Sequence, residues 1–178
     1  MTTLTALSQA TLGYYADADG DIVQVLRNAR SSVDASPVVL FERVMAADGL
    51  LWAAPLAGWH ERYSRVDARP DWGGTQARVS ALPEPARGIC RHTDGGIYEV
   101  LCVGKNALDG SSLVIYEHLW PFETHTWTRP HGEWAERFTP ITAHQYNLAV
   151  SQDRTEAQLM VNAAKQLRKN KAAKPKRK

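Results

Sequence analysis

The stretches WAAPLAGWHERY (Trp52–Tyr63) and WTRPHGEWAERF (Trp127–Phe138) decide the fold, because they repeat one pattern. A shift of 75 residues aligns positions 13–66 with 88–141 without a gap and gives fifteen identical pairs. The pairs include two tryptophans, a proline and a Glu-Arg dipeptide at fixed spacing. Such agreement indicates a tandem duplication, which must be found before any fold is assigned.

Each unit has the pattern of a small β domain. DADGDI (17–22) and HTDGGI (92–97) are Asp-Gly turn signals, and short strands separated by polar turns follow them. WHER and WAER are typical of a single helical turn. We expect a mainly β fold of two small SH3-like β-barrel or bent-sheet units. Because a unit this small buries only about 60% of its unfolded surface, the two units should pack as a pseudo-twofold pair.

The rest of the chain predicts a linker, a helix and a tail. The Pro- and Gly-containing stretch after the first unit is a linker, and TEAQLMVNAAKQLRKN predicts a helix begun by a Thr155–Gln158 capping box. An apolar stripe on this helix either packs on the second unit or docks a partner; it consists of Ala157, Met160, Val161, Ala164 and Leu167. The expected domains are repeat 1, linker, repeat 2, C-terminal helix and basic disordered tail, at residues 12–66, 67–86, 87–141, 142–170 and 171–178.

Composition narrows the class of protein. The 178 residues are 44% hydrophobic and 22% charged, as in soluble globular proteins. No apolar run approaches the roughly 20 residues of a membrane span, and the N-terminal residues lack the pattern of a secretory signal. Cys90 and Cys102 are too few for a disulfide framework. We therefore expect a cytoplasmic protein that makes no membrane contact.

Charge is distributed unevenly along the chain. Eight of the 21 lysines and arginines lie between Lys165 and Lys178, whereas all 19 acidic residues precede this segment. The body is therefore acidic and the tail strongly basic. Because cations placed on phosphates release counterions, the tail predicts loose affinity for nucleic acid.

Polar residues that occur at equivalent positions of both units are interpreted as structural residues. Glu42 and Glu117 interrupt apolar strands at equivalent positions, and Arg62 and Arg137 recur with them. Since a buried carboxylate requires a partner, we predict structural ion pairs Glu117–Arg137 and Glu42–Arg62. The shared tryptophans are interpreted as core residues, with a ligand-stacking platform as the alternative.

Residues found in only one unit are the better site candidates. Arg129 stands where the first unit has Ala54, two residues after Trp127 on one strand face. Tyr116 lies on the preceding strand, so the three side chains can stack a planar ring and hold an anion. A solvated Arg129 and a catalytic Arg129 remain alternatives. Further ligand-binding candidates of the second unit are His92, Tyr98 and His118.

Signals for metals and cofactors are missing. The histidines follow no metal-ligand spacing, and there is no phosphate loop or nucleophile elbow. We therefore expect no metal, no cofactor and no assigned catalytic residue.

The second unit resembles the small bacterial and phage family called domain of unknown function 1653. The resemblance covers residues 87–141 and is carried by Gly88, His92, Tyr98 to Leu101, Val114 to Tyr116, Trp127, Arg129, Pro130 and Phe138. Asp94 stands where the family usually has lysine, and NALDGSS departs from its acidic loop. The resemblance implies a small β domain and no activity, with the first unit a degenerate copy lacking the arginine.

Three functions remain open. The first is a non-enzymatic binding protein whose Trp127/Arg129/Tyr116 pocket takes a planar anionic ligand, a nucleotide-like molecule or nucleic acid. The second is a protein-interaction or assembly module, homo-oligomer included, which docks through the first unit and the helix. The third is a small enzyme acting on a nucleotide with His92 or His118 as base.

Overall fold

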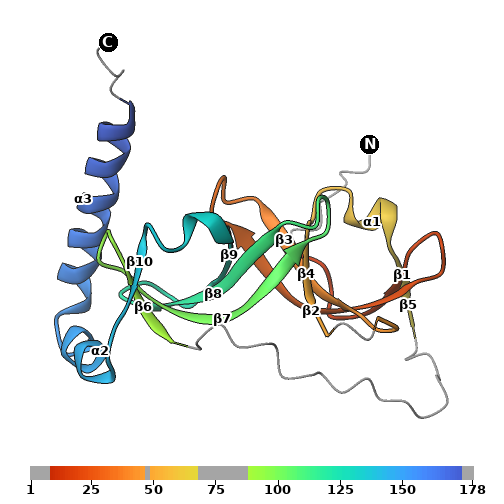
Figure 1. The fold of residues 1–178 in the computed structure, drawn as a ribbon, viewed down its shortest axis with the longest axis horizontal. Coiled ribbons are helices and arrows are strands. Elements are labelled where there is room, and N and C mark those ends of the chain that lie inside the picture. Colours follow the sequence, from red (N-terminus) through yellow and green to blue (C-terminus); the bar gives the residue numbers. More distant parts are fainter. Residues whose placement is uncertain (1–8, 47–48, 68–87, 174–178) are drawn as a thin grey trace, which may run out of the picture.

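The computed structural model describes residues 9–46, 49–67 and 88–173. The molecule is elongated and mainly β, and its two longest helical segments lie at one end (Figure 1). Nearly all of the predicted linker and most of the predicted basic tail lie outside the described residues.

The two halves of the chain contain the same elements in the same order. The first half contains β1 (Gly13–Ala16), β2 (Ile22–Ser31), β3 (Pro37–Arg43), β4 (Leu51–Pro55), α1 (Trp59–Arg62) and β5 (Ser64–Val66). The second half contains β6 (Ile89–His92), β7 (Ile97–Asn106), β8 (Ser112–Trp120), β9 (Thr126–Pro130), η1 (His131–Glu133) and β10 (Phe138–Pro140). A shift of 75 positions carries the bounds of β2 and β4 onto those of β7 and β9.

Six strands close one barrel between the halves. Antiparallel pairs join β2 to β3 and β3 to β4, and likewise β7 to β8 and β8 to β9. Two parallel junctions then close the ring, with Arg30 opposite Trp127 and Trp52 opposite Lys105. The halves thus share a single barrel, whereas the sequence predicted a barrel or bent sheet in each unit. Nothing in the sequence of either unit signals these parallel junctions.

Both faces of the central strands are buried, which explains the continuous apolar runs VVLF and LVIY. The barrel interior contains Ala29, Val38, Leu40, Leu51, Ala53, Cys102 and Ile115. The outer face of the first half packs a cluster around Val39, Phe41 and Trp59, and that of the second half packs one around Val114, Tyr116 and Phe138. Three cores, one shared, therefore hold the sheet together.

Local features bring β7 close to β4. A Cβ at Gly104 would lie 2.4 Å from the Leu51 carbonyl oxygen, so only glycine allows this approach. Register shifts interrupt β2 between Val25 and Arg27 and β7 between Val100 and Cys102. Such bulges bend strands, and here they occur at the same place in both halves.

Two helices, α2 (Ala143–Val150) and α3 (Arg154–Ala173), replace the predicted single helix. Thr142 and Gln145 form the capping box of α2. The Asp153 carboxylate accepts from the backbone N–H of Glu156, so the cap of α3 is Asp153 and the predicted Thr155 cap is wrong.

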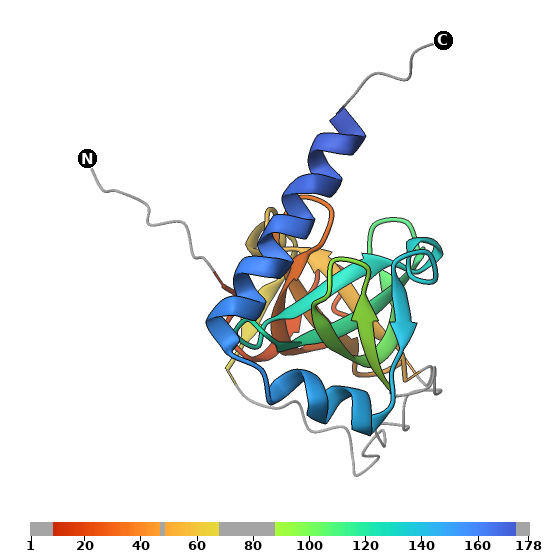
Figure 2. The same cartoon turned by 90° about the vertical axis from the view of Figure 1, so that its left-hand side faces the viewer.

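The predicted apolar stripe of α3 is only partly packed. Val161 is buried and Ala157 and Ala164 are half-buried, whereas Met160 and Leu167 are 67% and 70% exposed. Figure 2 shows α3 crossing the end of the second half and extending beyond the sheet. The helix therefore covers the second half with one face and leaves apolar side chains on another.

Candidate functional site

A small cavity of about 160 Å³ lies on the outer face of the second half, against α3. We call it the Arg129 pocket; it is lined by Ser32, His92, Asp94, Tyr98, Tyr116, Trp127, Arg129, Phe138, Lys165 and Arg168. Five of the six residues predicted to bind a ligand are thus brought together. His118 is the exception.

Strand register explains the grouping. Trp127 lies opposite Tyr116, and Arg129 lies opposite Val114. Side chains of directly paired residues share a sheet face, and positions two apart on a strand share it too. All four side chains therefore point to the outer face.

Arg129 is the central cation of the pocket. Its side chain is 11% exposed, and its Nη1 donates to the Glu133 carboxylate at 2.9 Å. The Nε–H is buried and meets no acceptor in hydrogen-bond geometry. A buried N–H without a partner costs about 1–3 kcal/mol, so the guanidinium retains an unused donor.

Aromatic rings build the walls around Arg129. Tyr116 makes edge contacts with Tyr98 and Phe138, both at 5.5 Å between ring centroids. Trp134 stacks on Phe138 at 3.7 Å with nearly parallel planes. Burial raises the pKa of both tyrosines, so their hydroxyls stay protonated donors at neutral pH.

His92 is neutral in the pocket. Burial lowers its pKa to about 4, against the opposing effect of the nearby Asp94 carboxylate. The backbone N–H of Asp94 donates to His92 Nδ1 at 3.0 Å. The proton of the neutral ring is therefore on Nε2.

The helix α3 supplies the remaining wall. Arg168 forms a bidentate ion pair with the buried Asp94 carboxylate, with N–O distances of 3.0 and 2.7 Å. Lys165 lies half-buried one turn earlier, where burial lowers its pKa. The pocket thus combines three cations with the two carboxylates of Glu133 and Asp94, and has a net positive charge.

His118 lies outside the pocket, in a stack of rings. It packs between Tyr98 at 4.5 Å and Phe122 at 5.0 Å. Its Nε2 is buried without a hydrogen-bond partner, and burial lowers its pKa to about 4. His118 therefore packs behind the Tyr98 wall of the pocket and does not line the pocket itself.

The predicted ion pairs do not form among the described residues. Glu117 pairs with Arg27 of the first half and accepts from the Thr126 hydroxyl at 3.0 Å. The side chains adjacent to Glu117 along β8 point to the outer face, so Glu117 points toward the barrel, away from Arg137. The Glu42–Arg62 pairing is wrong for the same reason.

The sequence interpretation did not include five lining residues, which are Ser32, Asp94, Phe138, Lys165 and Arg168. Lys165 and Arg168 lie three positions apart, which places them on one helix face. Asp94 was visible as a departure from the family pattern. Their convergence needed the position of α3, which no local pattern supplies.

Two further kinds of feature concern the described residues, a metal-ligand cluster and a membrane-spanning helix. No three His, Cys, Asp or Glu side chains in this part of the chain gather as metal ligands. None of its helices is long and apolar enough to cross a membrane.

Comparison with known proteins identifies a family only for the second half. No curated protein and no solved structure matches this chain. Residues 88–146, about a third of the chain, match the model of the family described as Protein of unknown function (DUF1653), which confirms the resemblance carried by the Trp127-x-Arg129-Pro130 segment.

Proposed function

We propose that this protein is a non-enzymatic binding protein whose Arg129 pocket takes an anionic ligand with a planar ring, such as a nucleotide or the end of a nucleic acid. The observation that carries the proposal is the buried Nε–H of Arg129, which has no acceptor. A ligand oxygen at this position would satisfy it, and charge-assisted hydrogen bonds are the strong ones.

The size of the pocket limits what enters it. At about 30 Å³ per water molecule, 160 Å³ holds only about five waters. This space suits one ring or one anionic group, with the rest of the ligand outside. A ligand that leaves the pocket along α3 passes Lys165 and Arg168, whose charges favour a phosphate.

The basic C-terminal segment extends the same surface. α3 carries Lys165, Arg168, Lys169 and Lys171 in its second half, and more cations follow in the sequence. Such a segment binds phosphate backbones without sequence preference and weakens steeply with salt. We assign it a supporting role in holding nucleic acid near the pocket.

The proposal includes an origin by duplication of one SH3-like unit. It is supported by fifteen identical residue pairs and by equivalent bulges in β2 and β7. In this view residues 12–66 and 87–141 remain the two copies, and only the second copy kept a pocket.

Thermal shift tests the binding proposal with nucleoside monophosphates and short single-stranded oligonucleotides. We expect them to raise Tm for the wild type and not for Arg129→Ala, each compared with its own ligand-free Tm. Arg62→Ala removes an exposed arginine of the first half and should keep the shift. No shift in the wild type, or an equal shift in Arg129→Ala, would refute the pocket.

A second function, a protein-interaction module, is favoured by the exposed apolar side chains of α3. Leu159, Met160 and Leu167 are each at least 66% exposed. If this face docks a partner, Met160→Lys with Leu167→Lys should abolish co-purification of that partner while nucleotide binding persists. An enzyme is less supported, because His118, His125 and His131 do not line the Arg129 pocket with His92.

A further inference from the structure

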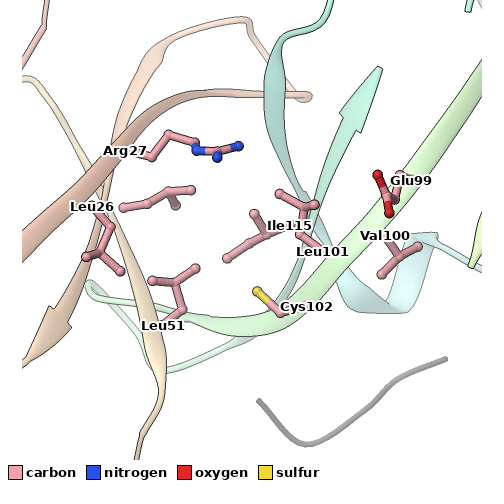
Figure 3. A pocket seen from close by; sticks show the side chains of 9 residues that line it. Leu26, Arg27, Leu51, Glu99, Val100, Leu101, Cys102 and Ile115 are labelled. Carbon is pink, nitrogen blue, oxygen red and sulfur yellow. The ribbon is translucent and has the colours of Figure 1, made fainter. Parts of the chain in front are cut away.

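A second cavity opens at one end of the shared barrel and shares no lining residue with the Arg129 pocket. Its volume is about 390 Å³, more than twice that of the Arg129 pocket. This is within the roughly 300–1,000 Å³ of small-molecule sites, which often occupy the mouths of β-barrels. We call it the barrel-mouth cavity; its lining comes from β2, β3, β4, β7 and β8 (Figure 3).

The inner surface of this cavity is apolar. Leu40, Leu51, Cys102 and Ile115 form its floor and are all at most 8% exposed. Leu26 stands at the opening and is 36% exposed. Figure 3 shows the side chains of Leu51, Cys102 and Ile115 directed toward the same space. An aliphatic chain entering here would contact hydrocarbon and sulfur on the floor, and the Arg27 guanidinium and the Glu99 carboxylate also line the cavity.

The opening is acidic. Glu99 lines the cavity, and Glu117 lies directly opposite it on β8. Glu42 lies opposite Leu51, so it faces the barrel at the same end. Three carboxylates therefore surround this end of the barrel.

Arg27 is the cation that an ion pair places beside these carboxylates, and it also lines the cavity. Arg27 pairs with Glu117, and its equivalent in the second half is Cys102, which carries no such charge. Glu42 and Glu99 form no ion pair within the described residues. Glu99 and Glu117 face each other across β7 and β8, and like charges on facing strands are unfavourable without a counter-charge.

From the apolar floor and this uncompensated charge we infer that the barrel-mouth cavity binds an aliphatic ammonium compound. The chain would occupy the space among Leu40, Leu51 and Ile115, and the ammonium group would lie near Glu99 and Glu42. Burial of the chain supplies affinity, and the carboxylates select the cation over a neutral or anionic head. This site is independent of the Arg129 pocket and of its proposed ligand.

The test uses n-octylamine, 1-octanol and octanoate, titrated at pH 7 into the full chain below their self-association concentrations and followed by calorimetry. We expect octylamine to bind, and to bind at least about tenfold tighter than octanoate. Octanoate binding equal to or tighter than octylamine, or no binding of octylamine, would overturn the inference.

Variants at the opening locate the site. Leu26→Trp should block the cavity and weaken octylamine binding at least about tenfold, since it removes most of the chain burial. Leu108→Trp places the same ring on an exposed turn at the opposite end of the barrel and should have no effect. Octylamine binding unchanged by Leu26→Trp would refute the location.

A charge variant separates the ammonium contact from chain burial. Glu99→Gln should weaken octylamine about two- to fivefold, the range of a partly exposed ion pair, and leave octanol unchanged. Glu136→Gln, on an exposed segment, is the matched control. An unchanged affinity for octylamine in Glu99→Gln would overturn the assigned head group.

Discussion

The two halves of the molecule have the same arrangement of strands but pack their outer faces differently. In the first half, Trp59 is 1% exposed and stacks on Tyr63 at 4.2 Å, so the outer face is filled. In the second half, the equivalent Trp134 is only half-buried and stacks on Phe138. The same arrangement of strands therefore carries a closed core in the first half and a pocket in the second half.

The difference depends on two equivalent positions at which the halves carry different residues. Arg129 replaces Ala54, and its ion-pair partner Glu133 replaces Gly58. A guanidinium in the first half would meet no side chain at Gly58, and the carboxylate near that position belongs to the exposed Glu61. A buried charge is tolerated only with a partner, so the pocket requires both substitutions.

Ala54→Arg tests this directly and should have the largest effect. Ala54 is 8% exposed and packs in the core around Trp59, so the substitution would bring a guanidinium into a filled apolar core. We expect the free energy of unfolding to fall by about 3–5 kcal/mol in urea denaturation. Arg129→Ala should cost less than about 1 kcal/mol, because it also removes an unsatisfied N–H. Equal losses would mean that the halves are packed alike.

Truncation of the equivalent tryptophans should give the next largest difference. Trp59→Ala removes a fully buried ring and should cost about 3–5 kcal/mol. Trp134→Ala removes a half-buried ring and should cost about 1–2 kcal/mol. Urea midpoints at constant m-value measure both, and a costlier Trp134→Ala would contradict the closed-core and open-pocket description.

Positions 43 and 118 are equivalent, and only position 118 in the second half carries a histidine. The stability of the protein should therefore depend on pH through His118. Burial lowers the pKa of His118 to about 4 from about 6.5, while the first half has Arg43 at this position. As pH falls from about 6.5 toward 4, the unfolded state takes up the proton first, so the free energy of unfolding falls.

We expect His118 to account for a loss of about 1–2 kcal/mol at pH 5 relative to pH 7. His118→Phe keeps the ring stack and should reduce the loss by that amount in urea titrations at the two pH values. A full acid response in His118→Phe would refute this assignment.

The smallest difference concerns equivalent aspartates in the two Asp-Gly turns. Asp94→Asn weakens the bidentate contact with Arg168 and should cost about 1 kcal/mol, reduced because Arg168 is 42% exposed. Asp19→Asn changes an exposed residue and should cost less than about 0.5 kcal/mol. Hydrogen exchange should also show faster opening of α3 in Asp94→Asn only, and slow exchange there would exclude an anchoring role.

Sequence reasoning predicted local elements well and their assembly poorly. The period of 75 residues predicted the same order of short strands in both halves, because turns and apolar patterns are local signals. The faces of Glu42 and Glu117 were misassigned, because a strand buried on both sides gives no clue to which core it faces. Only part of the Arg129 pocket could be predicted. Its strand residues were found by comparing the two halves of the sequence, whereas Lys165 and Arg168 reach the pocket from a separate helix.

The parallel junctions between β2 and β9 and between β4 and β7 have a consequence for how the chain folds. Each joins segments far apart in the sequence, and such non-local contacts slow folding because a long loop must close before they form. Until closure, each half presents unpaired strand edges, which invite association with other chains. Either half expressed alone should therefore aggregate, and the intact chain should fold slowly and as one cooperative unit.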